Sequence, residues 1–271
     1  MSAAHLGNCV SASGRAIVAM VCVMLSYSTS FIAAFAGDLL RDDHGAIVRG
    51  DADSKKLALV FTGDEHAEST APILDALKER RLRASFFVTG NFLRQPALSE
   101  LLERMTAEGH YLGPHSDSHS LYCAWDDREK NLVTQEFFTA DLRKNVGDLR
   151  AIGALKRGPV FFVPPYEWHN RQHVDWCRDL GVTLINFPPG TGSNRDYAPE
   201  GHPRFVPSEV LLRDILEYEQ KNPHGLNGFI VLMHLGSGRK DPLHPLLGRL
   251  CDRLIERGYK FERVDELLAD E

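Results

Sequence analysis

Short apolar runs rich in β-branched and aromatic residues alternate along this chain with stretches of helical period. This alternation constrains the fold more than any other feature of the sequence, because strands that alternate with helices predict βα units around a parallel sheet or barrel. Seven strands are predicted, at Leu57–Thr62, Ala84–Thr89, near Tyr111, Val160–Val163, Val182–Phe187, Phe229–His234 and Tyr259–Val264.

Helices are predicted between these strands from their apolar periodicity and their ends. The segment Thr70–Arg80 begins with Ser and Thr residues and has Pro72 in its first turn, which is typical of a helix start. The last helix has four apolar residues on one face and ends at Gly258. The remaining helices are predicted around Leu98, Leu101, Leu102 and Met105, and at Val133–Ile152, Asn170–Leu180 and Ser208–Lys221.

The length of 271 residues and the apolar content of 43% allow one large core, close to the usual size of a single α/β barrel. We expect this domain to span residues 56–271. A polar segment, residues 37–55, precedes it and forms a lead-in or a short hairpin. The net charge of −6 and the lack of a long basic run exclude the positive surface that nucleic-acid binding requires. Nothing in the sequence implies a stable protein partner.

The first 36 residues differ in composition from the rest of the chain. They contain one cation, Arg15, no acidic residue and an apolar stretch that ends in Ala34-Phe35-Ala36. This pattern predicts an export signal cleaved before Gly37, and therefore a periplasmic or extracellular protein. The alternative is an uncleaved membrane anchor, because the stretch is long enough to span a bilayer.

Cleavage would remove Cys9 and Cys22 and leave Cys123, Cys177 and Cys251, with no CxxC pair among them. An odd number without that motif does not predict a zinc-thiolate site. The sequence leaves open whether two of the three form a disulfide or all three are buried thiols.

Chemically reactive residues follow several predicted strands closely. Asp64 and Glu65 follow the first, His115 and His119 the third, and His234 ends the sixth. The carboxyl ends of parallel strands meet on one rim of a barrel, so we expect these residues to converge there.

His115-Ser116-Asp117-Ser118-His119 places two imidazoles four residues apart. On a helical turn, that spacing puts both on one face, where they can bind one cation. Asp64 or Glu65 would supply a third, carboxylate ligand. Taken alone, the histidines are equally compatible with a hydrogen-bonded pair, and the acidic residues with an ordinary βα turn.

Together these segments resemble the polysaccharide deacetylase family, carbohydrate esterase family 4, over roughly Lys56 to Leu268. The family motifs occur in order. Thr62-Gly63-Asp64-Glu65 resembles Thr-Phe-Asp-Asp, His115–His119 matches His-Ser/Thr-x-x-His in full, Val163-Pro164-Pro165-Tyr166 resembles Arg-x-Pro-Tyr, and Leu232-Met233-His234 matches Leu-x-His. The resemblance implies a distorted barrel of about seven βα units.

The resemblance also implies roles for individual residues. Asp64 would be the general base, and Glu65, His115 and His119 would hold a divalent metal, most simply zinc, although cobalt, nickel or iron suits the same ligands. The Tyr166 N–H would bind the oxyanion, and His234 would be the general acid, oriented by Asp196. The substrate would be an acetylated glycan that contacts the residues beside the third and fourth motifs, namely Pro165, Glu167, Trp168 and Tyr197.

Three departures from the family pattern affect these expectations. Val163 stands where the family has an arginine that pairs with the base, so Asp64 lacks that partner. Glu65 stands where the family has aspartate, so the side chain that would bind the metal is one methylene longer. The fourth motif is weak, and only Asn194-Arg195-Asp196-Tyr197 resembles it.

Loop aromatic residues are expected on the same rim, where sugar rings can stack on them: Tyr122, Trp125, Tyr166, Trp168 and Tyr197. The sequence thus predicts a metal-dependent hydrolase that removes acetyl groups from a glycan. One alternative is a metal-bearing glycan-binding module without catalysis. An iron oxygenase with two histidines and one carboxylate is a second, but such enzymes typically have antiparallel folds.

Overall fold

Strand β3, Lys56–Gly63, is buried along nearly its whole length and pairs with β4, β8 and β9 in the structure, which is a computed structural model. The structure describes residues 39–155 and 158–269. The predicted export signal, residues 1–36 with Cys9 and Cys22, lies outside these residues and stays a prediction.

A seven-stranded sheet is formed by the described residues, in the order β1-β2-β8-β3-β4-β5, with β9 also paired to β3. Strand β3 is parallel to both β4 and β8. Parallel strands covered on both faces are apolar throughout, which explains the apolar runs in the sequence. The strands are Leu40–Arg41 (β1), Ile47–Arg49 (β2), Ser85–Val88 (β4), Tyr111–Pro114 (β5), Phe229–His234 (β8) and Lys260–Phe261 (β9).

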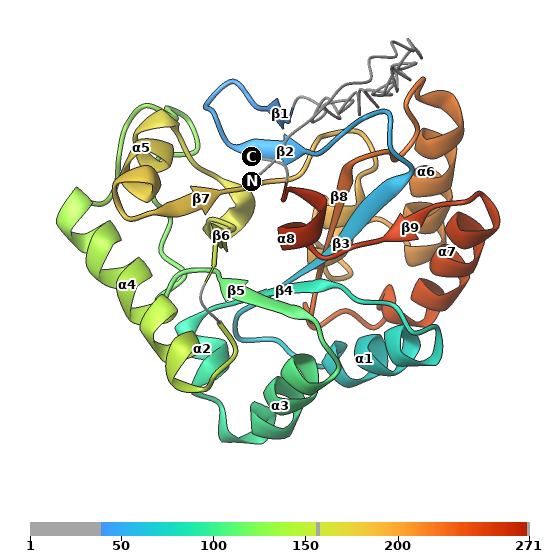
Figure 1. Ribbon diagram of the computed structural model, residues 1–271, viewed down its shortest axis with the longest axis horizontal. Coiled ribbons are helices and arrows are strands. Elements are labelled where there is room, and N and C mark those ends of the chain that lie inside the picture. Colours follow the sequence, from blue (N-terminus) through green and yellow to red (C-terminus); the bar gives the residue numbers. More distant parts are fainter. Residues whose placement is uncertain (1–38, 156–157, 270–271) are drawn as a thin grey trace, which may run out of the picture. The chain divides into compact units, whose positions relative to one another are not determined.

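Two further strands bring this sheet towards closure. Strands β6, Val160–Phe162, and β7, Val182–Leu184, pair in parallel. Just after β7, Ile185 forms a parallel bridge with Ile47 of β2. At the other edge, the Val163 N–H donates to the carbonyl oxygen of Pro114 across 3.4 Å. The strands therefore follow one another around a distorted barrel (Figure 1), and the predicted α/β barrel fold is confirmed.

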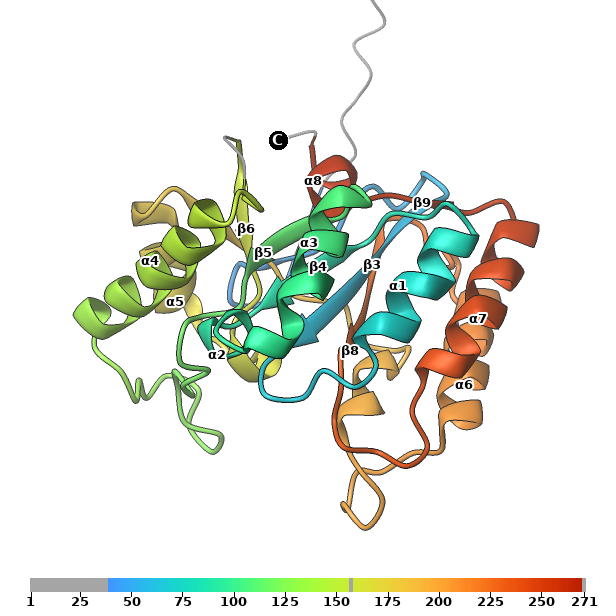
Figure 2. The same ribbon diagram turned by 90° about the horizontal axis from the view of Figure 1, so that it is seen from below.

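The long helices lie outside the strands in both ribbon views (Figures 1 and 2). In α7 the buried residues are Leu247, Leu250, Cys251 and Leu254, the apolar stripe predicted from the sequence. The helices are Thr70–Glu79 (α1), Gly90–Leu93 (α2), Ser99–Ala107 (α3), Gln135–Ala151 (α4), Arg171–Asp179 (α5), Ser208–Lys221 (α6), His244–Glu256 (α7) and Val264–Leu267 (α8), with 3-10 turns at Pro96–Leu98, Pro165–Glu167 and Ser193–Tyr197.

Most predicted elements are present with small shifts at their ends, and two strands are shorter than expected. The strand expected to reach Val264 ends earlier because Val264 begins α8, where its N–H donates to Ser85 Oγ at 2.9 Å. The strand expected to reach Phe187 ends at Leu184. Of the two forms expected for residues 37–55, the structure has a hairpin, and its second strand pairs with β8.

The three cysteines of the described region, Cys123, Cys177 and Cys251, are buried and unpaired. Burial raises the pKa of all three thiols, to about 11 for Cys123. A thiol with a raised pKa stays protonated at neutral pH and reacts slowly. Of the two possibilities left by the sequence, the structure therefore has buried thiols.

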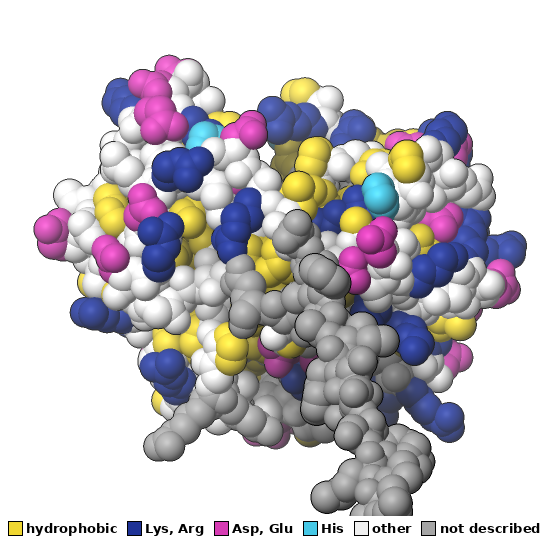
Figure 3. All heavy atoms as spheres, turned by 45° about the horizontal axis from the view of Figure 1, so that its top comes forward, with side chains coloured by type: hydrophobic (Ala, Val, Ile, Leu, Met, Phe, Trp, Pro, Cys, Tyr) yellow, Lys and Arg dark blue, Asp and Glu magenta, His cyan; other side chains and the backbone are white. Residues whose placement is uncertain are grey.

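Basic and acidic side chains are interspersed on the face shown in Figure 3. No helix among the described residues is both long enough and apolar enough to cross a membrane.

Candidate active site

One open cleft brings together most of the residues predicted to carry chemistry. It lies at the carboxyl ends of β3 and β8, as expected for a barrel of this type. Pro165 and Asp196 are buried beside it. The predicted residues that line the cleft are Asp64, Glu65, His115, His119, Tyr166, Glu167, Trp168, Tyr197 and His234.

His115, directly after β5, is buried and held at both its backbone and its ring. Its N–H donates to Asn145 Oδ1 at 2.9 Å, and its ring Nδ1 lies 2.7 Å from the carbonyl oxygen of Val163. Because a carbonyl only accepts, Nδ1 carries the proton and Nε2 keeps its lone pair. Burial lowers the pKa of His115 well below the ordinary value. A neutral imidazole fixed in this way is typical of a metal ligand.

The loop between His115 and His119 is not helical, so the predicted helical turn is wrong. Ser116 and His119 instead have left-handed backbones, with φ of 74° and 54°. Asp141 holds the loop from α4, since its carboxylate accepts from the Asp117 and Ser118 N–H groups, each at 3.0 Å. The two imidazole centroids are still only 5.1 Å apart, because the loop folds back on itself.

The carboxylate beside the histidine pair belongs to Asp64. Its Oδ2 lies 3.4 Å from His119 Nδ1, whereas Glu65 is exposed. The other oxygen, Oδ1, accepts hydrogen bonds from Thr89 Oγ1 at 2.7 Å and Asn91 Nδ2 at 3.1 Å. These two neutral donors fix the Asp64 carboxylate. The family's arginine is absent, because its position is taken by Val163, whose side chain is buried in the core.

The donors in this cluster fit a divalent metal in kind. Tetrahedral zinc ligands about 2.1 Å from the ion lie about 3.4 Å from one another, which matches the separation of Asp64 Oδ2 and His119 Nδ1. Burial lowers the pKa of His119 too, which favours the neutral, ligating form. The cluster is not closed, however. Nowhere in residues 39–155 and 158–269 do three or more His, Cys, Asp or Glu residues already stand close enough to hold an ion.

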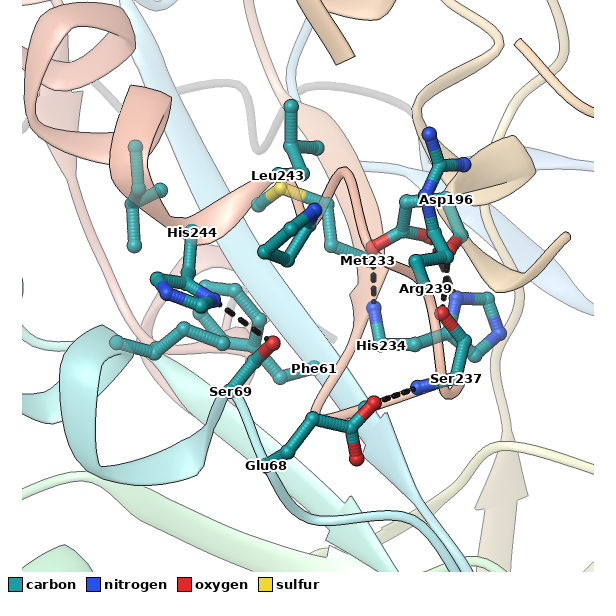
Figure 4. A pocket seen from close by; sticks show the side chains of 14 residues that line it. Phe61, Glu68, Ser69, Asp196, Met233, His234, Ser237, Arg239, Leu243 and His244 are labelled. Carbon is teal, nitrogen blue, oxygen red and sulfur yellow. Dashed lines mark hydrogen bonds and ion pairs between the residues drawn. The ribbon is translucent and has the colours of Figure 1, made fainter. Parts of the chain in front are cut away.

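His234 and Asp196 form a hydrogen-bonded pair at the end of β8 (Figure 4). One carboxylate oxygen of Asp196 lies 2.7 Å from His234 Nδ1, and the other accepts from the His234 N–H at 2.9 Å. Burial by itself lowers the pKa of His234, but the charge and hydrogen bond of Asp196 outweigh burial and raise it. The pair therefore favours a protonated imidazole, which can donate a proton.

The loop after His234 is held by Glu68. Its Oε1 accepts from the Ser237 N–H at 2.7 Å and from the Gly238 N–H at 2.5 Å. Ser237 Oγ in turn donates to the carbonyl oxygen of Asp196 at 2.9 Å (Figure 4). This loop thus links Glu68 to the His234–Asp196 pair and fixes its surroundings.

A tight turn at Pro165–Glu167 places Tyr166 over the histidine pair. Tyr166 and Glu167 have left-handed backbones, with φ of 60° and 52°. The Tyr166 ring centroid lies 4.5 Å from that of His119. No acceptor among the described residues takes a hydrogen bond from the Tyr166 N–H, so this donor is available to a ligand, as the oxyanion role requires.

Two tryptophans form a platform beside this turn. The Trp125 and Trp168 ring centroids are 5.3 Å apart, and the Arg128 guanidinium lies 3.7 Å above the Trp168 ring. Trp168 Nε1 donates to the carbonyl oxygen of Ala124, whereas Trp125 is 58% exposed. Tyr122, which was expected on the rim, is fully buried against Phe138, so that expectation is wrong.

Sequence reasoning missed four residues that position the site: Thr89, Asn91, Asp141 and Asn145. Thr89 and Asn91 follow the carboxyl end of β4, so the strand-end rule used for Asp64 applies to them too. Asp141 and Asn145 lie one turn apart among the buried residues of α4. Two polar residues on an otherwise apolar helix face were the signal that could have found them.

Fold and site together define an α/β barrel domain with a cleft lined by histidines and carboxylates. Residues 49–185 match the family described as polysaccharide deacetylase, so the chain belongs to that family. It is 37% identical over 243 residues to the peptidoglycan-N-acetylmuramic acid deacetylase PdaA of Bacillus subtilis, which covers 85% of this chain and 78% of that protein.

Two other similarities are more distant. The peptidoglycan-N-acetylglucosamine deacetylase PgdA of Listeria monocytogenes is 26% identical over 223 residues, covering 80% of this chain. The chain spans only 29–40% of the length of several curated relatives, PgdA included. The structure of BA3943, a carbohydrate esterase family 4 pseudoenzyme from Bacillus anthracis, superposes with a TM-score of 0.65 at 21% identity, covering 84% of this chain and 70% of that one. This last similarity concerns the fold alone.

Proposed function

We propose that this chain is an exported, metal-dependent hydrolase that removes acetyl groups from an N-acetylated glycan. One observation carries the proposal: a single cleft contains Asp64 beside a pair of neutral histidines and a His234 imidazole held for proton donation by Asp196. These are the groups that amide hydrolysis needs, namely donors for a Lewis acid and a general acid. The names of PdaA and PgdA support peptidoglycan as the substrate class.

Asp64, His115 and His119 would hold the metal. When bound, the ion would polarise the acetamide carbonyl and lower the pKa of a water molecule. Two imidazoles and one carboxylate suit zinc, and also cobalt, nickel or iron. We assign the carboxylate to Asp64 and not to Glu65, because Asp64 lies beside His119 and Glu65 is exposed.

The remaining groups act on the acetamide itself. The Tyr166 N–H donates to the carbonyl oxygen as negative charge develops on it. His234 donates the Nε2 proton to the departing nitrogen, and Asp196 keeps the imidazole oriented and charged until then. Asp64 has one oxygen bonded to Thr89 and Asn91 and the other facing His119. Because both carboxylate oxygens of Asp64 already have partners, its position supports the role of metal ligand over the role of general base.

The glycan would extend from this centre over the aromatic platform. Exposed Trp125, which lies tilted beside Trp168, offers an apolar face to a sugar ring. Pro165 and Tyr197 border the same region, with the Tyr197 ring centroid 6.0 Å from that of His234.

Acetate release tests the function directly. The zinc-loaded protein, starting at Gly37, would be assayed on N-acetylated peptidoglycan fragments, chitin oligomers and O-acetylated xylan. We expect acetate from an N-acetylated substrate, and loss of that activity in His234→Ala with zinc retained. Glycan binding without acetate release would instead establish a catalytically silent binding module. N-terminal sequencing of exported protein tests the cleavage site, and intact residues 1–36 in the membrane fraction would establish an anchor.

A further inference from the structure

The N-terminal hairpin, residues 40–49, has no role in the mechanism above. Its second strand, β2, lies beside the end of β7 (Figure 1), where the Asn186 N–H donates to the carbonyl oxygen of Ile47 at 2.8 Å. Arg171, at the start of α5, donates to the carbonyl oxygen of Asp43 at 2.7 Å. The hairpin is therefore fixed to the segments that follow the tight turn of the active site.

Asp42 lies in the bend of this hairpin and uses both of its carboxylate oxygens. Oδ1 accepts from the N–H groups of His44 and Ala46, each at 3.0 Å. Oδ2 lies 3.0 Å from Nε2 of His169, which is fully buried. Burial raises the pKa of Asp42, but His169 and the two N–H groups outweigh burial and lower it. Asp42 is therefore a charged carboxylate at neutral pH, and the hairpin fixes its direction.

The contacts of His169 define its tautomer. Its Nδ1 lies 3.4 Å from Asn186 Nδ2, and the Oδ1 of the same amide accepts from the Phe187 N–H at 2.9 Å. Because an amide nitrogen only donates, Nδ1 accepts and the proton is on Nε2, which faces Asp42. Among the described residues, Asp42 is the only acceptor within reach of Nε2. A buried N–H without an acceptor is costly, so Asp42 favours this tautomer.

The same Asn186 amide reaches the turn of the active site. Its Nδ2 donates to the carbonyl oxygen of Glu167 at 2.8 Å, and Glu167 follows Tyr166 in the left-handed part of that turn. A left-handed backbone in residues with side chains persists only where surrounding contacts hold it. A continuous path of contacts thus runs from Asp42 through His169 and Asn186 to the turn.

We propose that Asp42 and His169 are positioning residues that hold the Tyr166 N–H where the oxyanion forms. The inference rests on the proposed deacetylation, in which that N–H donates to the acetyl carbonyl oxygen. Both residues act through Asn186. A donor that is already in place needs no reorientation as charge develops, and a displacement of about 1 Å can cost about 100-fold in rate. The hairpin is in this way a part of the active site.

Asp42→Asn tests the positioning role. The new amide keeps its oxygen towards the hairpin N–H groups and turns its NH2 group towards His169. A donor then meets a donor there or, in the other tautomer of the ring, at Asn186. We expect kcat to fall by about 10- to 100-fold, with KM within a few-fold and zinc content unchanged. Asp53→Asn makes the same change in charge on a side chain that is 94% exposed, and should leave kcat unchanged.

A second measurement follows the turn without reference to activity. In protein containing tyrosine labelled at its amide nitrogen, the Tyr166 signal is identified by its loss in Tyr166→Phe. We expect this signal to move in Asp42→Asn and to stay in place in Asp53→Asn. Urea denaturation of the same variants gives the free energy of unfolding, which separates a displaced turn from a weakened fold.

Asn186→Ser interrupts the same path at a later point and leaves the Asp42 carboxylate in place. Alone, it should also lower kcat and move the Tyr166 signal. Combined with Asp42→Asn, it should lower kcat by no more than the larger single effect, because residues in one network are not additive. Two effects that multiply in full would overturn the shared path.

The outcomes distinguish this inference from the proposed function. Acetate release by the wild type together with an unchanged kcat in Asp42→Asn would overturn the positioning role and leave the deacetylase intact. A lower free energy of unfolding with an unmoved kcat and Tyr166 signal would also overturn it, because the hairpin would then only stabilise the fold. No acetate from any acetylated glycan would overturn the proposed function. The Tyr166 signal would still decide whether Asp42 holds the turn.

Discussion

Asp196 holds His234 at two points, at the ring Nδ1 and at the backbone N–H, across 2.7 and 2.9 Å. The first point governs the charge of the imidazole. Asp196→Asn removes the charge that raises the pKa of His234, so burial should dominate and lower that pKa. We expect the basic limb of kcat/KM to move to lower pH and kcat to fall by about 100-fold. The pH–rate profile checks this, with Asp179→Asn on the surface of α5 as control. A basic limb that stays in place would mean that another group is the acid.

Zinc binding decides between the two neighbouring acidic residues. Asp64 lies beside His119, and Glu65 is exposed. Loss of a residue that hydrogen-bonds to a metal ligand weakens metal binding by roughly 10- to 100-fold. Asp64→Asn, which changes a ligand itself, should weaken zinc binding by more than this. Glu65→Gln has the same change in charge and should keep zinc. Competition with a chelator of known affinity measures both. The reverse result would return the ligand role to Glu65.

Thr89 has two functions in one hydroxyl group. It accepts from the Phe92 N–H at the start of α2 and donates to Asp64 Oδ1. Thr89→Val should therefore lower the free energy of unfolding by about 1–2 kcal/mol through the lost cap, and weaken zinc binding by about 10- to 100-fold. Thr89→Ser should preserve both. Urea denaturation and zinc competition measure the two effects, and a full-strength zinc site in Thr89→Val would argue against the link to Asp64.

The exposed ring of Trp125 should contribute to glycan binding without taking part in the chemistry. We expect Trp125→Ala to raise KM by about 2- to 12-fold, which corresponds to the roughly 0.5–1.5 kcal/mol of one aromatic contact, with kcat unchanged. Phe137→Ala removes another exposed aromatic ring, on α4, and should change neither constant. Steady-state kinetics on an oligosaccharide of several units provides the measurement. A change confined to kcat would place Trp125 in a different role.

Acid should destabilise the fold through His110. This residue is buried, its Nδ1 accepts from the Ala84 N–H at 3.1 Å, and burial lowers its pKa to about 4. A histidine with a lowered pKa contributes its full stability above about pH 6.5 and loses it as the pH falls towards 4. The loss is on the order of 3 kcal/mol. Urea denaturation of His110→Asn between pH 7 and pH 4 should show a shallower decline than the wild type, whereas exposed His224→Asn should not.

The barrel and the rim positions were accessible from the sequence because both depend on a strong signal. A parallel strand buried on two faces is a nearly continuous apolar run, as in β3 and β8, and the residue after such a run lies at the rim. Asp64, His115 and His234 were therefore found. Asp196 was inferred from a weak motif, and only the contacts of the folded chain show that it reaches His234.

The local geometry of the site was not accessible in this way. Nothing in the residue types of Ser116 or His119 indicates a left-handed backbone, because glycine is the residue that usually adopts it. The loop instead takes its form from Asp141, more than twenty residues further along the chain. Tyr122 was misplaced for a similar reason, because a tyrosine in a loop segment is buried by a helix that follows it.

Ser116, His119, Tyr166 and Glu167 all keep a positive φ although none is glycine. For a residue with a side chain, each conformation costs about 1–2 kcal/mol. Glycine avoids this cost, but it lowers the free energy of unfolding by about 0.5–1 kcal/mol because the unfolded chain gains conformational freedom. Glycine at these positions should therefore raise resistance to heat, even as it removes the side chains of His119, Tyr166 and Glu167 from the cleft lining. Selection for thermostability alone would then replace these cleft residues first. Glycines at these four positions in a natural homologue would indicate a lineage in which catalysis is no longer maintained.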